Sequence, residues 1–236
     1  MKILGIECSA GPASVAITEN GVLLGSNFIN VKLTHSQTLM PMVEQTLKNC
    51  TLSLVDIDYI AVAAGPGSFT GVRIGISAVK GMAAPLKTPC VSVSTLFAMA
   101  QKYVDRDCIV CAVMDARCNQ VYNAMFEIKD GNITRLCDDR ALLCDELANE
   151  IENIYRTQDK PIIITGDGAK LFYPFVENFA QLSPESIVYQ NAVGVCLAAS
   201  TMIKKGQTVT ADELLPIYLR LPQAERELKK KEAERN

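Results

Sequence analysis

The second half of the chain repeats the order of elements in the first half, and this repeat limits the fold more than any other feature. A β-rich apolar run ends in Glu7, and a turn leads into a second short run at 14–17. Another apolar run at 108–114 is followed by Asp115, a polar turn and a strand at 121–128. Each half therefore opens with an antiparallel hairpin and an acid at the end of its first strand.

A strand that runs into a glycine-rich loop also occurs once in each half. The apolar run 59–64 precedes the loop 65–71, and the run 161–165 precedes the loop 166–168. Matching features in the same order indicate an α/β fold of two similar lobes, each with a mixed sheet flanked by helices.

At 236 residues, the chain can form one large domain or two small ones. The repeat favours a first lobe at 1–104 and a second at 105–222, whose end can pack back on the first. Segment 223–236 alternates acids and bases with few apolar residues, which predicts a frayed helix or a disordered tail. Helices are expected at 36–50 (capped by Ser36), 72–84, 95–104 and 191–204, further strands at 22–31 and 90–93, and an extended or short helical segment at 214–220.

The charge balance is slightly acidic, with a formal net charge of −3 and a pI near 5.3. A protein that holds nucleic acid alone normally has a basic surplus, so any tRNA or DNA contact is expected to depend on a partner protein. The nine cysteines do not indicate a disulfide framework, because their number is odd and several lie in apolar runs. Neither a signal peptide nor an apolar run of membrane-spanning length is found. We therefore expect a soluble, cytoplasmic chain with no membrane partner.

His35 is the sole histidine, and this argues against most familiar catalytic and metal sites. A histidine-based zinc or iron site needs at least two imidazoles or a cysteine cluster, and a serine nucleophile elbow is missing. Cys108 and Cys111 have zinc-like spacing, but they lie within one apolar strand, where their side chains point to opposite faces. We expect no metal site, and we expect His35 to be a capping or interface residue.

The segment from Gly65 to Gly75 reads GPGSFTGVRIG. It is not a Walker A loop, because no Lys-Ser/Thr pair follows Gly71, and its glycine spacing is wrong for a dinucleotide fingerprint. Phosphate binding and a plain strand-to-helix turn both remain open. In the following helix, Gly71, Gly75, Ala78 and Gly81 keep one side thin. Two explanations for this thin side remain open. Either another element of the same lobe packs closely on it, or a second protein chain docks there.

Six segments resemble the TsaB (YeaZ) family in the same order. They are ILGIECS, HSQTLMPMVEQTL, AAGPGSFTGVRIGISAVKGMA, VSVSTL, VMDARCNQVYNAMF and PIYLR, and the resemblance covers about residues 1–220. It implies the actin-like fold, also called ASKHA or ribonuclease H-like, of actin, Hsp70 and sugar kinases. It also implies a subunit without a catalytic site of its own that pairs with the enzyme TsaD.

In this resemblance, TsaD transfers a threonylcarbamoyl group to adenosine 37 (t6A37) of tRNAs that read ANN codons. The ATPase TsaE joins the pair, tRNA is contacted only through the complex, and a homodimer is the alternative when TsaD is absent. TsaD-type enzymes hold a metal with a His-x-x-x-His motif, whereas here Leu39 stands four residues after His35. No cofactor of its own is expected, and ATP or ADP is expected only at the interface of the complex.

By analogy with the family, the partner surface lies on the two helices of the first lobe. The residues assigned to it are His35, Leu39, Met42, Val43, Gly71, Arg73, Gly75, Ala78 and Lys80. A bulky residue at Gly75 is therefore expected to abolish TsaD binding and to leave the monomer folded.

The resemblance also places a vestigial nucleotide site at the strand-end acids and the glycine loops. It comprises Glu7, Gly65, Gly67, Asp115, Gly166 and Gly168. Sugar kinases and actin-like ATPases hold a metal–phosphate group where the two acids stand, although the acids can equally be turn or cap residues. The family usually has Asp, Gly and Glu where this chain has Glu7, Asn119 and Gln120, which argues against nucleotide binding. An ATP-hydrolysing enzyme or kinase of this fold is the alternative function, and a peptidase is disfavoured.

Overall fold

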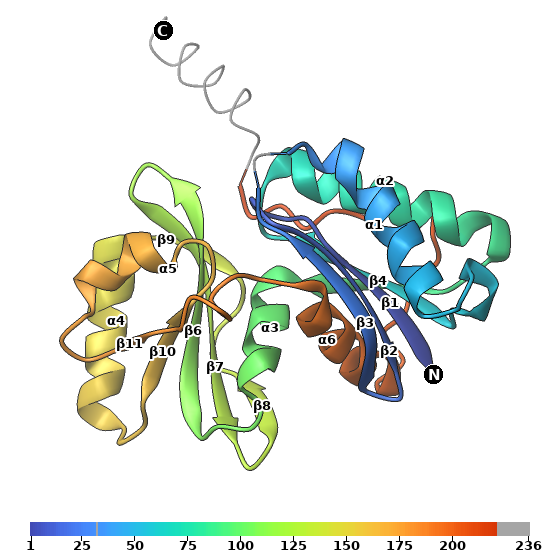
Figure 1. Ribbon diagram of the computed structural model, residues 1–236. Coiled ribbons are helices and arrows are strands. Elements are labelled where there is room, and N and C mark those ends of the chain that lie inside the picture. The colour runs from blue at the N-terminus through green and yellow to red at the C-terminus, as the bar shows by residue number, and fades with distance from the viewer. Residues whose placement is uncertain (32, 221–236) are drawn as a thin grey trace, which may run out of the picture.

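The computed structural model describes residues 1–31 and 33–220, which fold into two lobes (Figure 1). Each lobe is built on one β-sheet with helices packed on it, which confirms the predicted α/β class. Segment 223–236, for which a frayed helix or tail is predicted, lies outside the described residues. Within the described ranges, we find no helix with both the length and the apolar character needed to cross a membrane.

The first lobe holds a five-stranded sheet with the order β3-β2-β1-β4-β5. Its strands are β1 (Lys2–Glu7), β2 (Ala13–Glu19), β3 (Val22–Ile29), β4 (Tyr59–Gly65) and β5 (Cys90–Ser94). The β1–β2 and β2–β3 pairs are antiparallel, whereas β4 is parallel to β1 and β5 is parallel to β4. The sheet is therefore mixed, with the meander on one side and the crossover strands on the other.

The second lobe holds a six-stranded sheet with the order β11-β10-β6-β7-β8, and β9 also pairs with β7. Its strands are β6 (Cys108–Arg117), β7 (Gln120–Lys129), β8 (Asn132–Arg135), β9 (Arg140–Leu143), β10 (Ile162–Thr165) and β11 (Gln181–Leu182). The strands β6, β7, β8 and β10 repeat the pairing of β1, β2, β3 and β4. The predicted repeat is confirmed, whereas β8, β9 and β11 are too short to produce a clear periodic pattern in the sequence.

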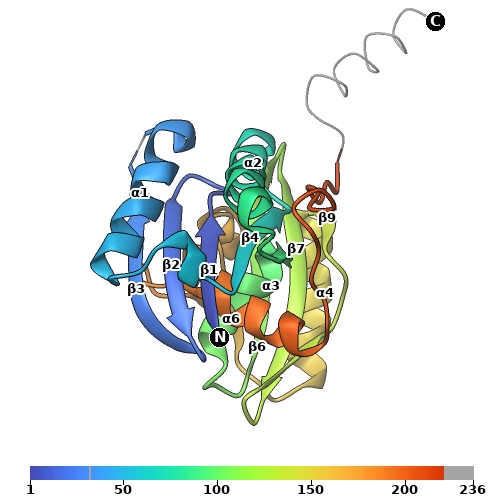
Figure 2. The same cartoon turned by 90° about the vertical axis from the view of Figure 1, so that its right-hand side faces the viewer.

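Helices cover the outer faces of both sheets and fill the space between them (Figures 1 and 2). They are α1 (His35–Asn49), α2 (Phe69–Leu86), α3 (Thr95–Ala100), α4 (Cys144–Thr157), α5 (Ala169–Phe172) and α6 (Ala192–Lys204), with 3-10 turns at Leu54–Asp56, Gln101–Tyr103 and Tyr173–Phe175. The first sheet carries α1 and α2 on its outer face, and the second carries α4 and α5. Between the sheets lie α3 and α6, and α6 packs against β1 and β2 although it follows the second sheet in the sequence.

Two helix starts differ from the sequence prediction. Ser36 is predicted to cap the first helix, but Thr34 occupies the N-cap position of α1 and makes no side-chain cap hydrogen bond. The second helix begins at Phe69, inside the predicted glycine loop, because the Ser68 hydroxyl accepts a hydrogen bond from the Gly71 N–H at 3.3 Å. The end of the loop is therefore the first turn of α2.

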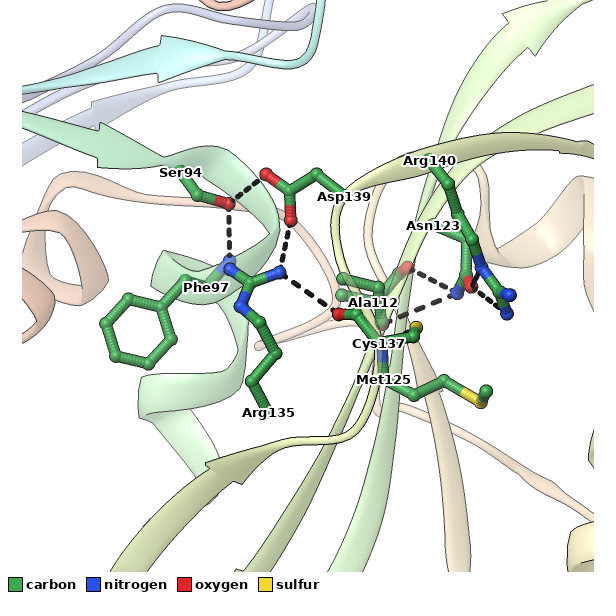
Figure 3. A network of polar contacts seen from close by, with 10 residues as sticks. Ser94, Phe97, Ala112, Asn123, Met125, Arg135, Cys137, Asp139 and Arg140 are labelled. Atoms are coloured by element: carbon green, nitrogen blue, oxygen red, sulfur yellow. Dashed lines mark hydrogen bonds and ion pairs between the residues drawn. The ribbon is translucent and has the colours of Figure 1, made fainter. Parts of the chain in front are cut away.

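A polar network ties the start of α3 to the second lobe (Figure 3). Ser94 Oγ donates a hydrogen bond to Asp139 Oδ2 at 2.6 Å and accepts one from the Phe97 N–H at 3.2 Å. Asp139 Oδ1 accepts a hydrogen bond from Arg135 Nη1 at 2.6 Å, and the guanidinium of Arg135 lies 4.8 Å from the ring centroid of Phe126. Because Ser94 ends β5 and Asp139 precedes β9, this network joins the two lobes.

Candidate functional site

A cleft of about 500 Å³ lies between the lobes, at the ends of the strands that the repeat brings together. Its walls come from the turn after β1, the loop after β4, the end of β6, the loop after β10 and a segment close to the end of the described chain. The lining residues include Ser9, Gly67, Phe69, Asp115, Arg117, Asp167, Tyr218 and Arg220.

Glu7 and Asp115 hold equivalent turns in the two lobes. Glu7 Oε1 accepts a hydrogen bond from the backbone N–H of Ser9 at 2.6 Å. Asp115 Oδ1 accepts one from the backbone N–H of Arg117 at 2.7 Å. In each lobe the carboxylate binds the backbone two residues further on, so both acids act as caps of their own turns.

Burial distinguishes these two acids. Glu7 is completely buried, and among the described residues its Oε2 has no hydrogen-bond partner. Burial raises the pKa of Glu7 to about 7, although hydrogen bonding to Ser9 opposes this shift. Asp115 is exposed and lines the cleft. Of the two acids, Asp115 is therefore the one that a molecule in the cleft would meet.

Two further titratable side chains lie close to Glu7 and interact with its charge. Burial raises the pKa of Asp167 to about 6, and Asp167 Oδ1 accepts a hydrogen bond from Gln190 Nε2 at 3.1 Å. Burial lowers the pKa of Lys102 to about 7, and Lys102 Nζ donates to the carbonyl oxygen of Tyr189 at 2.8 Å. The back of the cleft therefore holds three groups whose pKa values are shifted towards neutrality. Sequence reasoning missed Lys102 and Asp167 as neighbours of Glu7, because nothing in the local sequence marks either side chain for burial.

Gly65 and Gly166 are packed against the chain itself. Both have a positive φ, +124° and +113° respectively. A β-carbon at Gly65 would overlap the carbonyl oxygen of Ile217, and one at Gly166 would overlap the carbonyl oxygen of Val113. The space beside each glycine is therefore filled by the protein's own backbone.

The other two loop glycines are also covered by the turns that carry the acids. A β-carbon at Gly67 would overlap the Ser9 backbone, and one at Gly168 would lie 2.8 Å from the backbone nitrogen of Asp115. Of the six residues predicted to form a vestigial nucleotide site, Gly67 and Asp115 line the cleft. The structure places Glu7, Gly65, Gly166 and Gly168 in buried positions behind it.

Residues 214–220, here called the strap, connect the two lobes at the cleft. The Ile217 N–H donates a hydrogen bond to the carbonyl oxygen of Ala64 in the first lobe at 2.7 Å. Arg220 Nη1 donates one to the carbonyl oxygen of Ala116 in the second lobe at 2.8 Å. An ordered segment is predicted here, but its place at the cleft depends on contacts that are distant in sequence.

An aromatic and cationic stack stands where the strap meets α2. The rings of Phe69 and Tyr218 are stacked with centroids 4.9 Å apart. The guanidinium carbon of Arg73 lies 4.4 Å from the Phe69 ring centroid. The family analogy assigns Arg73 to the partner surface, and its side chain is exposed. The contact with Phe69, which lines the cleft, holds Arg73 close to the mouth of the cleft.

The α1 residues assigned to the partner surface lie mostly inside the first lobe. Leu39, Met42 and Val43 are at most 3% exposed and pack in the core between the helices and the sheet. Their assignment to a docking surface is wrong, because the apolar side of α1 faces its own sheet. His35 is half-buried, and its Nε2 lies 2.7 Å from the carbonyl oxygen of Ala10.

The glycine-thinned side of α2 also faces its own lobe. A β-carbon at Gly75 would lie 2.8 Å from Cys8 Sγ and 3.2 Å from Val62 Cγ2, and one at Gly71 would overlap the Cys8 carbonyl oxygen. Packing within the same lobe therefore accounts for these two glycines, and their assignment to the partner surface is wrong. A bulky residue at Gly75 would push against Cys8 and Val62, so, contrary to the expectation from the family analogy, we expect it to destabilise the monomer itself.

The remaining residues of α1 and α2 assigned to the partner surface, and their neighbours on these helices, are half-buried or exposed. Met40 is 45% exposed, and a β-carbon at Gly81 would meet nothing within 4 Å. Ala78 and Lys80 are half-buried, and Lys80 Nζ donates to the carbonyl oxygen of Asp212 at 3.2 Å. We define a helical face by six of the exposed residues of these two helices. They are Met40, Pro41, Arg73, Ser77, Gly81 and Ala84.

The two cysteines with zinc-like spacing lie on opposite faces of β6. Cys108 packs in the core between the sheets, whereas Cys111 packs in the core beneath α4 and α5. In the part of the chain that the structure describes, no group of three His, Cys, Asp or Glu side chains is arranged to hold a metal ion.

The amino-acid sequence matches one family model and several known proteins over most of its length. The family model of TsaD, tRNA N6-adenosine threonylcarbamoyltransferase, matches residues 30–227. The tRNA threonylcarbamoyladenosine biosynthesis protein TsaB of Escherichia coli (strain K12) is 31% identical over 93% of this chain and 95% of its own. The TsaB protein of Bacillus subtilis (strain 168) is 29% identical over 95% of this chain and 96% of its own.

Solved structures show the same architecture. YeaZ from Pseudomonas aeruginosa has a TM-score of 0.77 and 28% identity, and covers 92% of this chain and 99% of its own. The ethanolamine utilization protein EutJ from Carboxydothermus hydrogenoformans has a TM-score of 0.52 and 14% identity, and covers 84% of this chain and 90% of its own. The second likeness concerns the fold alone. Together these neighbours confirm the predicted actin-like fold.

Proposed function

The chain belongs to the TsaB (YeaZ) family, and from this premise we propose that it is an accessory subunit of a tRNA-modifying complex. It binds a TsaD-type transferase and supports formation of the threonylcarbamoyl group on adenosine 37 of tRNAs that read ANN codons. It does not itself catalyse the transfer. The proposed place of action is the cytoplasm, and tRNA is contacted through the complex.

The match with TsaB proteins over 93–95% of the chain carries this proposal. The family model of TsaD also matches residues 30–227, which supports a common domain architecture for this chain and the transferase. Two proteins of one design can present similar helix layers to each other, which suits a pairing of paralogues. The acidic net charge of −3 also favours an accessory role, since most of the tRNA contact would then come from the partner.

The arrangement of the cleft supports a non-catalytic role. One oxygen of Glu7 and one of Asp115 are engaged with the backbone of their own turns. The Ile217 carbonyl oxygen occupies the space beside Gly65. A phosphate cradle needs free backbone N–H groups and room for the phosphate at such a loop. We therefore place no nucleotide in this cleft, and we assign ATP or ADP to the interface with the transferase.

The helical face is the proposed docking surface for the transferase. Ser77, Gly81 and Ala84 are small, exposed residues at successive turns of α2, which permits a partner helix to approach closely. Met40 adds an exposed apolar side chain from α1. TsaE joins the assembled pair in this proposal, and a homodimer through the helical face stays a prediction.

Reconstitution with a TsaD-type transferase tests the function. The chain alone, the transferase alone and the mixture are each supplied with threonylcarbamoyl-adenylate and an ANN-decoding tRNA. We expect the mixture to modify tRNA faster than the transferase alone, and the chain alone to form no modified tRNA. ATP hydrolysis by the chain alone that is lost in Asp115→Ala would instead support the alternative, an ATPase or kinase of this fold.

Two glycines of α2 provide a matched test of the docking surface. Gly81→Leu is expected to keep the fold and raise the melting temperature, because leucine favours a helix by about 1 kcal/mol over glycine. It should nevertheless weaken transferase binding at least about tenfold in a pull-down or calorimetric titration, since a side chain would then separate the helices. Gly75→Val is expected to lower the melting temperature of the isolated chain. Normal transferase binding by folded Gly81→Leu would contradict the assignment.

A further inference from the structure

One edge of the first sheet is long and uncharged. The strand β3 is the outer strand of this sheet, and within residues 1–31 and 33–220 it pairs with β2 alone (Figure 2). Its eight residues, Val22–Ile29, include neither a charged residue nor a proline. The uncharged stretch continues through Val31. An outer strand presents unpaired backbone N–H and C=O groups that can pair with another chain.

The other sheet edges carry protection that β3 lacks. At the opposite edge of the first sheet, Cys90 of β5 exchanges backbone hydrogen bonds with Val209 at 2.8 and 2.9 Å. In the second sheet, β11 has two residues, and β8 and β9 have four each and contain Arg135 and Arg140 respectively. Short strands, a covering segment and charged side chains all oppose edge pairing. Among the described strands, β3 combines length, absence of charge and an open edge.

The contacts of β3 show which part of it is accessible. A β-carbon at Gly25 would lie 2.7 Å from Cys50 Sγ, and Ile29 packs against the core below α1, so α1 covers one face. Leu24 and Phe28 are 42% and 46% exposed. The register of the β2–β3 pair shifts once, beside Leu24 at the hairpin end, and the rest of the strand pairs regularly. A regular and partly apolar strip therefore remains open to a further strand.

The polarity of β3 is symmetric about Ser26. Three apolar residues, 22–24, precede the sequence Gly-Ser-Asn, and Phe28 and Ile29 follow it. When two copies pair antiparallel about a two-fold axis at Ser26, Leu24 of each copy lies opposite Phe28 of the other. Apolar ends then meet apolar ends, and no like charges face each other. We propose that β3 is a self-association edge, through which two copies of the chain form one continuous sheet.

This edge is separate from the helical face. The strand β3 lies at the edge of the first sheet, whereas α1 and α2 lie on one face of that sheet (Figure 2). The pairing groups belong to the backbone of β3, and the helical face is formed by exposed side chains of the two helices. The inference therefore does not rest on the proposed function, and failure of one leaves the other standing. It also differs from a homodimer through the helices, because variants at Ser26 and Ser77 affect different surfaces.

Charge changes at Ser26 test the pairing in the full-length chain. Ser26 is exposed, so Ser26→Lys and Ser26→Glu leave the core intact, which thermal unfolding checks. Each variant alone places two like charges opposite each other at the axis and is expected to raise the dimer Kd roughly five- to tenfold. An equimolar mixture of the two is expected to form a heterodimer at least as tight as the wild-type dimer, because opposite charges then meet. Sedimentation equilibrium measures all four samples.

A cysteine at the same position gives a geometric readout. Directly opposed residues of antiparallel strands have Cα atoms about 4.5–5.5 Å apart, within the range that a disulfide spans. Ser26→Cys is expected to form a covalent dimer under mild oxidation, with position 26 of both copies in the linked peptide. Ser186→Cys, at an exposed position of the second lobe, is the matched control and is expected to give no covalent dimer. A chain that stays monomeric at millimolar concentration overturns the proposal. So does a dimer that Ser26→Lys leaves unchanged, or one that the mixed variants fail to restore.

Discussion

Glu7 and Asp115 occupy equivalent turns of the two lobes, but their surroundings differ. Each carboxylate accepts the backbone N–H two residues further on, at 2.6 and 2.7 Å. Glu7 is buried behind the cleft with a pKa raised to about 7, whereas Asp115 is exposed on the cleft wall. The internal repeat thus retains the hydrogen bond from the carboxylate to the backbone, while packing between the lobes buries one acid and leaves the other exposed.

The glycine loops differ in a similar way. Gly65 lies against Ile217 of the strap, which comes from the far end of the described chain. Gly166 lies against Val113 of β6, a central strand of its own sheet. The first loop is therefore covered by a surface segment, and the second is covered by the framework of its lobe. This difference predicts unequal responses to the same substitution.

The largest expected difference concerns Gly166→Ala and Gly65→Ala. Both variants force alanine into a left-handed backbone conformation, but Gly166→Ala also pushes against β6, which cannot move without disturbing the sheet. We expect Gly166→Ala to lower the free energy of unfolding by about 3 kcal/mol or more. We expect Gly65→Ala to lower it by about 1–2 kcal/mol, because the strap can shift away. Urea denaturation measures both values.

Limited proteolysis separates the two effects. In Gly65→Ala the strap is expected to be cut faster than in the wild-type chain, while the sheets stay protected. In Gly166→Ala any increase should extend to the second lobe. Equal losses of stability with equal cleavage of the strap would contradict the difference between the loops.

The next largest effect is a pH dependence that distinguishes the two acids. The pKa of Glu7 is about 7 in the folded chain, against about 4.3 for an unfolded glutamate, so the folded state binds this proton more tightly. The stability linked to Glu7 is therefore greatest at low pH and falls as the pH rises from about 4.5 to about 7. Glu7→Gln removes the titration and keeps an acceptor for the Ser9 N–H. Asp115→Asn changes an exposed group.

We expect Glu7→Gln to be more stable than the wild-type chain by about 2–3 kcal/mol at pH 8 and nearly equal to it at pH 4. Asp115→Asn should differ from the wild-type chain by less than about 0.5 kcal/mol at both values. Asp167, with a pKa of about 6, lowers stability as the pH rises in all three proteins, so its effect cancels from the comparison. The variant Glu7→Gln also loses the attraction between Glu7 and Lys102, which reduces its gain in stability. Denaturation at several pH values supplies the curves. A destabilised Glu7→Gln at pH 8 would show that the ionised form of Glu7 is the stabilising one.

The smallest expected effect lies in the turn that follows each acid. In the second lobe, Arg117, Cys118 and Asn119 all have positive φ, whereas no residue of the turn at 8–12 in the first lobe does. Cys118 is exposed with φ +55°, so Cys118→Gly relieves strain and loses no packing. We expect the free energy of unfolding to rise by about 0.5–1 kcal/mol. Cys118→Ala is the control and should change it little. A thermal shift assay with a loss of stability in Cys118→Gly would contradict this account.

Much of the framework is predictable from short stretches of sequence. Alternating apolar residues and turn residues located the hairpins that end at Glu7 and Asp115, and glycines located both strand-to-helix loops. The orientation of α2 was not predictable in this way. Gly71 and Gly75 lie on one side of the helix, but a glycine has no side chain whose polarity indicates whether that side faces the sheet or the solvent. The same limit led to the wrong surface assignment of Leu39 and its neighbours on α1, since apolar residues suit a core and an interface equally well.

The sequence by itself determined the repeated order of strands, acids and glycine loops, because each of these depends on residues that are neighbours in the chain. Only the tertiary structure decided that Glu7 is buried while Asp115 is exposed, and that the strap reaches Gly65. Burial and close contact depend on segments that are far apart in sequence, such as β4 and residues 214–220. Their contribution to pKa values and packing exists only once the lobes have come together.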